Sequence, residues 1–194
     1  MYIEHFLLTE VNETNSYLVG CLQTRQAALI DAGGFDTRIV NTARREGLNV
    51  TWILITHDHY DHTGGLAEYR DEFPDARIVA GCKKPGGVKA QKADDGHTLQ
   101  VGSLAVRTLA IPGHTPDCVA YYFTRQTPPA VSALFAGDIL FAGSVGGASG
   151  ANHDSEIRGI REKILTLPES TPIYTGHGPG TTVGIEKGHN PFLT

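Results

Sequence analysis

One stretch of the chain decides both its fold and its chemistry: Thr56-His57-Asp58-His59-Tyr60-Asp61-His62-Thr63-Gly64-Gly65. It brings three imidazoles and two carboxylates together within the six residues from His57 to His62. The plain alternative is a polar turn at the start of a helix, where one aspartate caps the first turn. Capping needs only one polar group, so this density of imidazoles and carboxylates favours a metal-binding segment.

The residues on either side of this segment indicate how it is built. The apolar run 51–56 predicts a buried strand that ends where the histidines begin, and Gly65 to Phe73 predicts a helix after them. His57 and His59 are two residues apart, so an extended backbone points both side chains to the same side. A turn into the following helix directs Asp61 and His62 elsewhere. Neighbouring residues can therefore serve two different ions.

Three further polar residues follow strand-like runs later in the chain. His114 follows residues 106–111, Asp138 follows residues 134–136, and His177 follows residues 173–175. Glycine or proline stands beside each of them, which taken alone is ordinary turn composition. Because the ends of strands can meet at one rim of a sheet, these residues complete the ligand set that the first segment begins.

We expect two ligand sets joined by one carboxylate. His57, His59 and His114 hold the first ion, Asp61, His62 and His177 hold the second, and Asp138 bridges the two. Imidazole and carboxylate groups accept zinc, iron and manganese, so the donors indicate two divalent ions per chain, zinc first, with iron or manganese as alternatives. A coordination position left to solvent on each ion is typical of a catalytic site.

The predicted centre favours hydrolysis. A solvent molecule held between two such ions is acidified toward a pKa of about 7, so a metal-bridging hydroxide is available near neutral pH. The hydroxide attacks a carbonyl, and the ions stabilise the oxyanion that results. Asp138 holds the bridge and Asp61 orients the hydroxide or carries its proton, so both are catalytic candidates. The sequence has no Gly-x-Ser-x-Gly elbow to supply a serine nucleophile.

Two other residues are singled out beside the ligand set. Asp31 ends the apolar run 27–31, and it is predicted either to hold a ligand from behind by a hydrogen bond or to start a turn. Cys118 is predicted to pack in the core.

Strand-like and helix-like runs alternate in two similar halves. The first half predicts strands at 3–9, 16–19, 27–31, 51–56 and 76–80, and helices at 36–46 and 65–73. The second half predicts a hairpin at 96–111, strands at 118–124, 133–136 and 173–175, and a helix at 154–166. Two sheet-plus-helix halves indicate an α+β layered sandwich, and 194 residues suit one domain spanning residues 1–194.

Composition narrows the classes of partner. The formal net charge is −5 and the 16 basic residues are scattered, so no nucleic-acid surface is expected. The cluster around Lys83-Lys84 is interpreted as a solvated loop, with a local anion site as the alternative. No apolar run suits a membrane span, the N-terminus lacks a signal-peptide pattern, and three cysteines fit no disulfide framework. We expect a cytoplasmic protein that acts on a small molecule, and no feature indicates an oligomeric state.

These motifs together resemble the metallo-β-lactamase superfamily, in particular glyoxalase II-like hydrolases. The resemblance rests on residues 56–65, Pro112-Gly113-His114-Thr115-Pro116, Gly137-Asp138 and Gly176-His177-Gly178-Pro179, in the family order, and it covers nearly the whole chain. It implies an αββα four-layer sandwich with the metals at one sheet edge. It also implies a thioester substrate such as S-D-lactoylglutathione, the substrate of hydroxyacylglutathione hydrolases.

The chain also departs from glyoxalase II enzymes in two places. Those enzymes carry a C-terminal helical domain that helps to hold glutathione, whereas this chain is expected to be a single domain without it. The Gly-rich stretch Ser144–Gly150 also lacks a side chain that would grip a glutathione carboxylate.

Other readings of the same residues stay open. One alternative is a persulfide dioxygenase, which the chain resembles through Gly113-His114-Thr115-Pro116 and Cys118, with a single iron on His57, His114 and Asp138. A lactonase or phosphodiesterase of the same superfamily and a non-catalytic metal-binding scaffold are the others.

Overall fold

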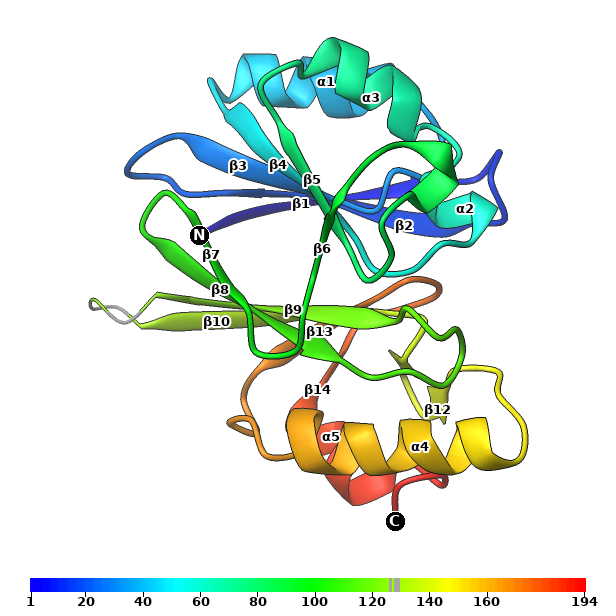
Figure 1. Cartoon of the computed structure of the whole chain (residues 1–194). Coiled ribbons are helices and arrows are strands. Elements are labelled where there is room, and N and C mark those ends of the chain that lie inside the picture. Colours follow the sequence, from blue (N-terminus) through cyan, green and yellow to red (C-terminus); the bar gives the residue numbers. More distant parts are fainter. Residues whose placement is uncertain (126, 128–129) are drawn as a thin grey trace.

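The computed structural model describes residues 1–125, 127 and 130–194, and it contains two six-stranded sheets packed face to face (Figure 1). One sheet has the strand order β1-β2-β3-β4-β5-β6, and the other has the order β14-β13-β10-β9-β8-β7. Helices cover the outer face of each sheet, α1 and α3 on the first and α4 and α5 on the second. The predicted αββα sandwich is therefore confirmed.

The first sheet starts antiparallel and continues parallel. β1 pairs with β2 and β2 with β3 in antiparallel fashion, and β3 to β6 run parallel. Its strands are β1 (Tyr2–Leu8), β2 (Thr14–Gly20), β3 (Gln26–Ile30), β4 (Asn49–Ile55), β5 (Arg77–Ala80) and β6 (Gln91–Lys92). The helices of this half are α1 (Thr37–Arg45), α2 (Tyr60–Thr63) and α3 (Leu66–Glu72), with a 3-10 turn at Pro85–Gly87.

The second sheet is mainly antiparallel, with one parallel pair between β10 and β13. Its strands are β7 (Thr98–Val101), β8 (Leu104–Ala110), β9 (Val119–Arg125), β10 (Val131–Gly137), β13 (Pro172–Thr175) and β14 (Thr181–Thr182). A small hairpin of β11 (Leu140–Phe141) and β12 (Ser144–Val145) follows β10. The helices are α4 (Ala151–Gly159), the π-helical segment Ile160–Ile164 and α5 (Val183–His189).

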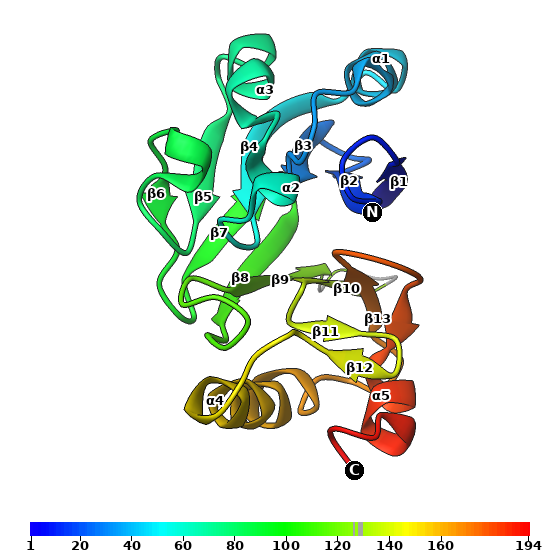
Figure 2. The same ribbon diagram turned by 90° about the vertical axis from the view of Figure 1, so that its right-hand side faces the viewer.

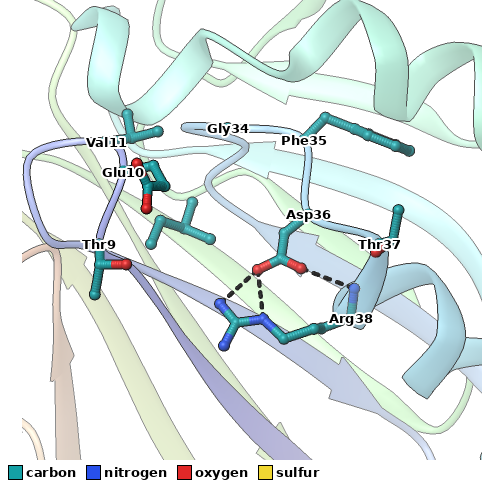
Figure 3. Close-up of a pocket in the computed structure, with 9 residues that line it drawn as sticks. Thr9, Glu10, Val11, Gly34, Phe35, Asp36, Thr37 and Arg38 are labelled. Atoms are coloured by element: carbon teal, nitrogen blue, oxygen red, sulfur yellow. Dashed lines mark hydrogen bonds and ion pairs between the residues drawn. The ribbon is translucent and has the colours of Figure 1, made fainter.

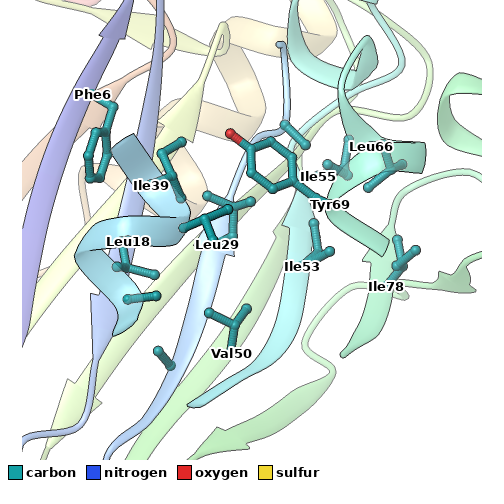
Figure 4. Close-up of a cluster of buried hydrophobic side chains, with 14 of the residues drawn as sticks. Phe6, Leu18, Leu29, Ile39, Val50, Ile53, Ile55, Leu66, Tyr69 and Ile78 are labelled. Carbon is teal, nitrogen blue, oxygen red and sulfur yellow. The ribbon is translucent and has the colours of Figure 1, made fainter. Parts of the chain in front are cut away.

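Burial explains why these layers hold together. Apolar side chains of α1 and α3 meet one face of the first sheet, around Leu29, Ile39 and Tyr69 (Figure 4). A second cluster, which includes Trp52 and Phe123, fills the space between the sheets. A third joins the second sheet to the helices of its own half. The sheets are thus covered on both sides, and polar groups gather at their edges.

The site-bearing residues all follow strand ends at one rim of the two sheets. Asp31 follows β3, Thr56 and His57 follow β4, and Asp138 follows β10. Because β3 runs parallel to β4, and β10 parallel to β13, the carboxyl ends of each pair lie at the same edge. In Figure 2, α2 lies above the β11–β12 hairpin on this side of the molecule.

Several short elements were not expected from the sequence. The sequence analysis assigns no element to the glycine-containing stretches that form the β11–β12 hairpin, β14 and α5, and α4 begins at Ala151 and not at Asp154. Glycine lowers local propensity, so tertiary packing decides these segments. Within the described residues, no helix combines the length and the apolar character that crossing a membrane requires.

Candidate metal centre

The segment from His57 to His62 takes the predicted path. β4 ends at Ile55, the backbone stays extended at His59, with φ −85° and ψ 150°, and α2 begins at Tyr60. The His57 and His59 rings lie on one side, and His57 Nε2 is 3.0 Å from His59 Nδ1. Asp61 and His62 face the other donor group. The turn into α2 therefore divides neighbouring residues between two groups.

The first group contains His57, His59 and His114, whose donor nitrogens all lie within 4.8 Å of one another. His114 Nε2 is 3.2 Å from His59 Nδ1, which also faces His57. One nitrogen that faces two others in this way cannot make a good hydrogen bond to both, whereas a shared cation satisfies all three.

The second group contains Asp61, His62 and His177, again within 4.8 Å. The Oδ2 atom of Asp61 is 3.3 Å from Nε2 of His177. His62 is fully buried, while the other two are partly exposed, so this group opens toward solvent on one side.

Asp138 lies between the two groups. Its Oδ2 atom is 4.0 Å from His57 Nε2 and 3.7 Å from His114 Nε2. The same oxygen is 3.6 Å from His177 Nε2, and Oδ1 is 3.4 Å from His62 Nε2. A single carboxylate thus faces both donor groups, and its role as a bridge between two ions stays a prediction.

Both the spacing of the donor atoms and the absence of hydrogen-bond partners for two of them fit bound divalent ions. Two ligands that are 2.0–2.2 Å from a shared tetrahedral ion lie about 3.3–3.6 Å apart. The measured separations of 3.0–4.0 Å bracket that value. His62 Nε2 and Asp138 Oδ1 are buried and have no hydrogen-bond partner. Because unpaired buried polar atoms are costly, a bound cation accounts for both.

Asp31 supports this cluster from behind, as one of its two predicted roles required. Its Oδ1 accepts a hydrogen bond of 2.8 Å from the Thr56 amide, and its Oδ2 accepts one of 2.8 Å from the Thr56 hydroxyl. Oδ2 is also 2.8 Å from His62 Nδ1. A carboxylate that accepts a hydrogen bond from Nδ1–H leaves the lone pair of Nε2 free to coordinate a metal ion.

The same carboxylate reaches His57 through Thr56. The Thr56 hydroxyl donates to Asp31, so it is free to accept from His57 Nδ1, which is 3.1 Å away. This leaves His57 Nε2 without a hydrogen, directed at the other donors. Asp31 therefore sets the tautomers of two ligands, one in each group.

Charge and burial set the protonation of these residues in the absence of metal. Burial and the neighbouring His62 lower the pKa of His57 to about 3. Burial acts to lower the pKa of His62 as well, but Asp31 and Asp138 outweigh it and raise this pKa. Burial raises the pKa of Asp138, and the close contact with His62 reverses this and leaves it below its ordinary value. Asp138 therefore remains a carboxylate.

Sequence reasoning missed several residues that touch the centre, Asn12 and Glu156 among them. Asn12 donates a hydrogen bond of 2.9 Å to Asp61 Oδ2. Glu156 of α4 is fully buried, and its Oε1 accepts a bond of 3.3 Å from the His114 amide. Burial, with some help from Asp138, raises the pKa of Glu156 to about 7. Both contacts join residues more than 40 positions apart, so no local pattern announces them.

Cys118 packs in the core, as predicted. It is buried in the apolar cluster of the second half, and its sulfur accepts a contact of 3.3 Å from the Thr115 amide. Burial raises the pKa of its thiol to about 12. A neutral thiol that is buried in an apolar cluster is a packing residue and not a nucleophile.

A pocket of about 310 Å³ lies beside the turn between β1 and β2 (Figure 3). Its walls include Val11 and Gly34, and Arg38 pairs with Asp36 inside it. Val11 and Gly34 are chain neighbours of Asn12 and Gly33, which touch Asp61. None of the metal-binding candidates lines the pocket, so it is a neighbour of the centre and not part of it.

Because residue 33 is glycine, the backbone at Asp61 can pass close to the segment that follows β3. A Cβ atom on Gly33 would lie 1.8 Å from the carbonyl oxygen of Asp61. We expect Gly33→Ala to lower the free energy of unfolding by roughly 3 kcal/mol, because backbone atoms must move to admit the methyl group. Urea denaturation measures the effect. Gly188→Ala is the control, since a Cβ there meets nothing within 4 Å. Equal unfolding midpoints for the two variants would contradict the argument.

Comparisons with known proteins agree with this geometry. The family described as the metallo-beta-lactamase superfamily matches residues 9–177. The probable metallo-hydrolase YqgX of Bacillus subtilis (strain 168) is 34% identical, with 93% of this chain and 92% of that protein covered. The hydroxyacylglutathione hydrolase-like protein of Mus musculus is 31% identical over 83% of this chain, which spans 56% of that relative's length.

Solved structures are similar over the whole fold. The B3 metallo-beta-lactamase BLEG-1 superposes with a TM-score of 0.84 at 31% identity, with both chains covered completely. The structure of TTHA1623 in a di-iron-bound form has a TM-score of 0.77 at 28% identity, with 98% of this chain and 100% of that chain covered. The matched family, the relative that is similar along its length and the shared fold lead to one conclusion: this chain belongs to the metallo-beta-lactamase superfamily, whose fold binds divalent metals.

Proposed function

We propose that this chain is a dinuclear metal-dependent hydrolase of thioesters, with S-D-lactoylglutathione as the first substrate to assay. The observation that carries the proposal is the position of Asp138. One carboxylate oxygen lies within 4.0 Å of imidazole nitrogens from both donor groups, which suits a ligand shared by two ions. Zinc is the first choice of metal, and iron and manganese suit the same donors.

The relatives support a hydrolase and leave the substrate to experiment. The relative that is similar along its whole length is described as a probable metallo-hydrolase. The mouse relative is described as hydroxyacylglutathione hydrolase-like, and this chain spans about half its length. The thioester substrate and the cytoplasmic location inferred from the free cysteines Cys21, Cys82 and Cys118 are parts of the same proposal.

The residues of the chain have separate tasks in this mechanism. Two divalent ions, when bound, supply Lewis acidity that acidifies water and polarises a carbonyl oxygen. Asp31 keeps a hydrogen on Nδ1 of His62, and Thr56 keeps one on Nδ1 of His57. The Nε2 lone pair of each ring is therefore free to coordinate an ion. Asp61 makes its contacts with Asn12 and His177 through Oδ2, and we assign Oδ1 to receive the proton that the attacking water loses.

Asp61 is suited to remain ionised for this task. Burial alone would raise its pKa, but the hydrogen bond from Asn12 and the nearby His62 lower it below its ordinary value. The side chain is 19% exposed, so a proton that it accepts can pass to solvent. Asp138 is more buried, which suits a structural bridge better than a proton carrier.

Elemental analysis combined with a thioester assay tests the proposal. We expect about two metal equivalents per chain and release of free thiol from S-D-lactoylglutathione, with turnover lost on chelation and restored by zinc. Lactones and phosphodiesters are the comparison substrates. Faster turnover of either class would replace the thioester assignment, and a metal-replete protein that turns over none of them would contradict a hydrolase altogether.

A persulfide dioxygenase is the second candidate, and a specific observation favours it. Asp138 Oδ2 lies 4.0 Å from His57 Nε2 and 3.7 Å from His114 Nε2, so these three residues offer a set of two imidazoles and one carboxylate. Three such donors suit a single iron. One iron per chain, with oxygen consumed on glutathione persulfide and no thioester turnover, would establish this function in place of hydrolysis.

A further inference from the structure

The turn between β1 and β2 has an unfavourable backbone. Val11 accepts a hydrogen bond of 3.1 Å from the Thr14 amide, and both residues between them are left-handed, Asn12 at φ 53° and Glu13 at φ 55°. Two successive left-handed residues closed by such a bond are typical of a type I′ turn, here the last part of the loop between Leu8 and Thr14, and asparagine and glycine are the favoured residues in it. Asparagine adopts this conformation at a lower cost than glutamate does, so contacts outside the turn help to hold it in place.

Those contacts lead to the second donor group. The Asn12 side-chain amide donates to Asp61 Oδ2 at 2.9 Å, and the buried Thr14 hydroxyl lies 3.4 Å from the same oxygen. The backbone at Thr14 also forms a β-bridge with His177, and the backbone amide of Asn15 donates a hydrogen bond of 2.8 Å to the carbonyl oxygen of Gly176. The turn therefore touches Asp61 through side chains and His177 through the backbone.

A hydrogen bond on Asp61 matters because this side chain is at the open side of the centre. An ionised carboxylate has about four acceptor positions on its two oxygens, so the bonds from Asn12 and Thr14 leave positions for an ion. The bond also restrains rotation of a partly exposed side chain, and partners of ligating carboxylates tune metal affinity in this way. Without Asn12, Asp61 has water as a competing partner.

We infer that Asn12 is a positioning residue that holds Asp61 for the second ion, with Thr14 as a weaker aid. The inference rests on the proposed two-ion centre, and it does not depend on which substrate is hydrolysed. If Asn12 only shaped the turn, glycine would replace it without loss, because glycine adopts φ near 53° with ease. Asn12→Gly therefore removes the side-chain amide while it keeps the conformation of the turn.

The test is a zinc titration of metal-free protein by calorimetry, for the wild type, Asn12→Gly and Glu13→Gly. We expect Asn12→Gly to weaken one of two binding events by 10- to 100-fold and to leave the other unchanged. Glu13→Gly relaxes the same turn and keeps the amide, so both of its binding events should match the wild type. Adding Thr14→Val to Asn12→Gly should weaken the same event further.

Each outcome of the titration decides the inference. The inference would be overturned if Asn12→Gly bound both zinc ions with wild-type affinity. It would also be overturned if both binding events weakened equally. A wild-type protein that binds one ion only would overturn it as well. If Asn12→Gly weakens one event while no thioester is hydrolysed by any form, the positioning role stands and the proposed function fails.

Discussion

Asp138→Ala is expected to reduce thioester turnover by on the order of a thousandfold or more, because one substitution removes a ligand from both donor groups. Asp138 Oδ2 faces His57, His114 and His177 at 3.6–4.0 Å. Without it, the four buried or partly buried imidazoles of His57, His62, His114 and His177 lose the carboxylate that they all face. Metal content measured on the purified variant should fall together with kcat/KM.

Asp58 supplies the matched control for this experiment. It lies between two of the ligands in the chain, yet its carboxylate turns away and accepts a hydrogen bond of 2.6 Å from the Gly86 amide. Asp58→Asn keeps that acceptor, so its metal content and turnover should match those of the wild type. Full metal content and full turnover in Asp138→Ala would refute the bridging role.

Asp31→Asn should also weaken metal binding in both donor groups, although Asp31 itself belongs to neither group. Asparagine tolerates the left-handed backbone at this position, where φ is 55°, so the fold is expected to survive. The side-chain amide nitrogen of the new asparagine would donate hydrogen bonds to the Thr56 hydroxyl and to His62 Nδ1, where Asp31 Oδ2 now accepts them. The hydroxyl then donates to His57, and both rings carry their hydrogens on Nε2, where they oppose the ions.

The loss in this variant is expected to be 10- to 100-fold in affinity for each ion, measured by competition with a chromophoric chelator. Asp36→Asn is the control, because Asp36 caps α1 and asparagine caps equally well. Circular dichroism should show both variants folded. Wild-type affinities in Asp31→Asn would show that Asp31 does not determine the tautomers of His57 and His62.

The ligand candidates were accessible to sequence analysis because their chemistry and their placement coincide. Imidazoles and carboxylates just after buried strands are unusual, and parallel strands bring such positions together. Asp31 was visible for the same reason, although its partners were not. The layered fold followed from the alternation of apolar runs. Each of these inferences used information within a few residues of the position concerned.

The remaining features depend on contacts between distant parts of the chain. Asn12 meets Asp61 from 49 residues away, and Glu156 meets His114 from 42 residues away. The β11–β12 hairpin and α5 form in glycine-containing stretches where packing overrides propensity. Which nitrogen of each histidine faces the centre likewise depends on hydrogen bonds that no local pattern encodes.

The division of donors between the two halves bears on how the protein matures. His57, His59, Asp61 and His62 come from the first half, and His114, Asp138 and His177 come from the second. Neither half alone offers a complete shell, so high-affinity loading must wait until both have met. We therefore expect a chain that lacks either half to bind divalent metal weakly, because it holds only part of each proposed donor group.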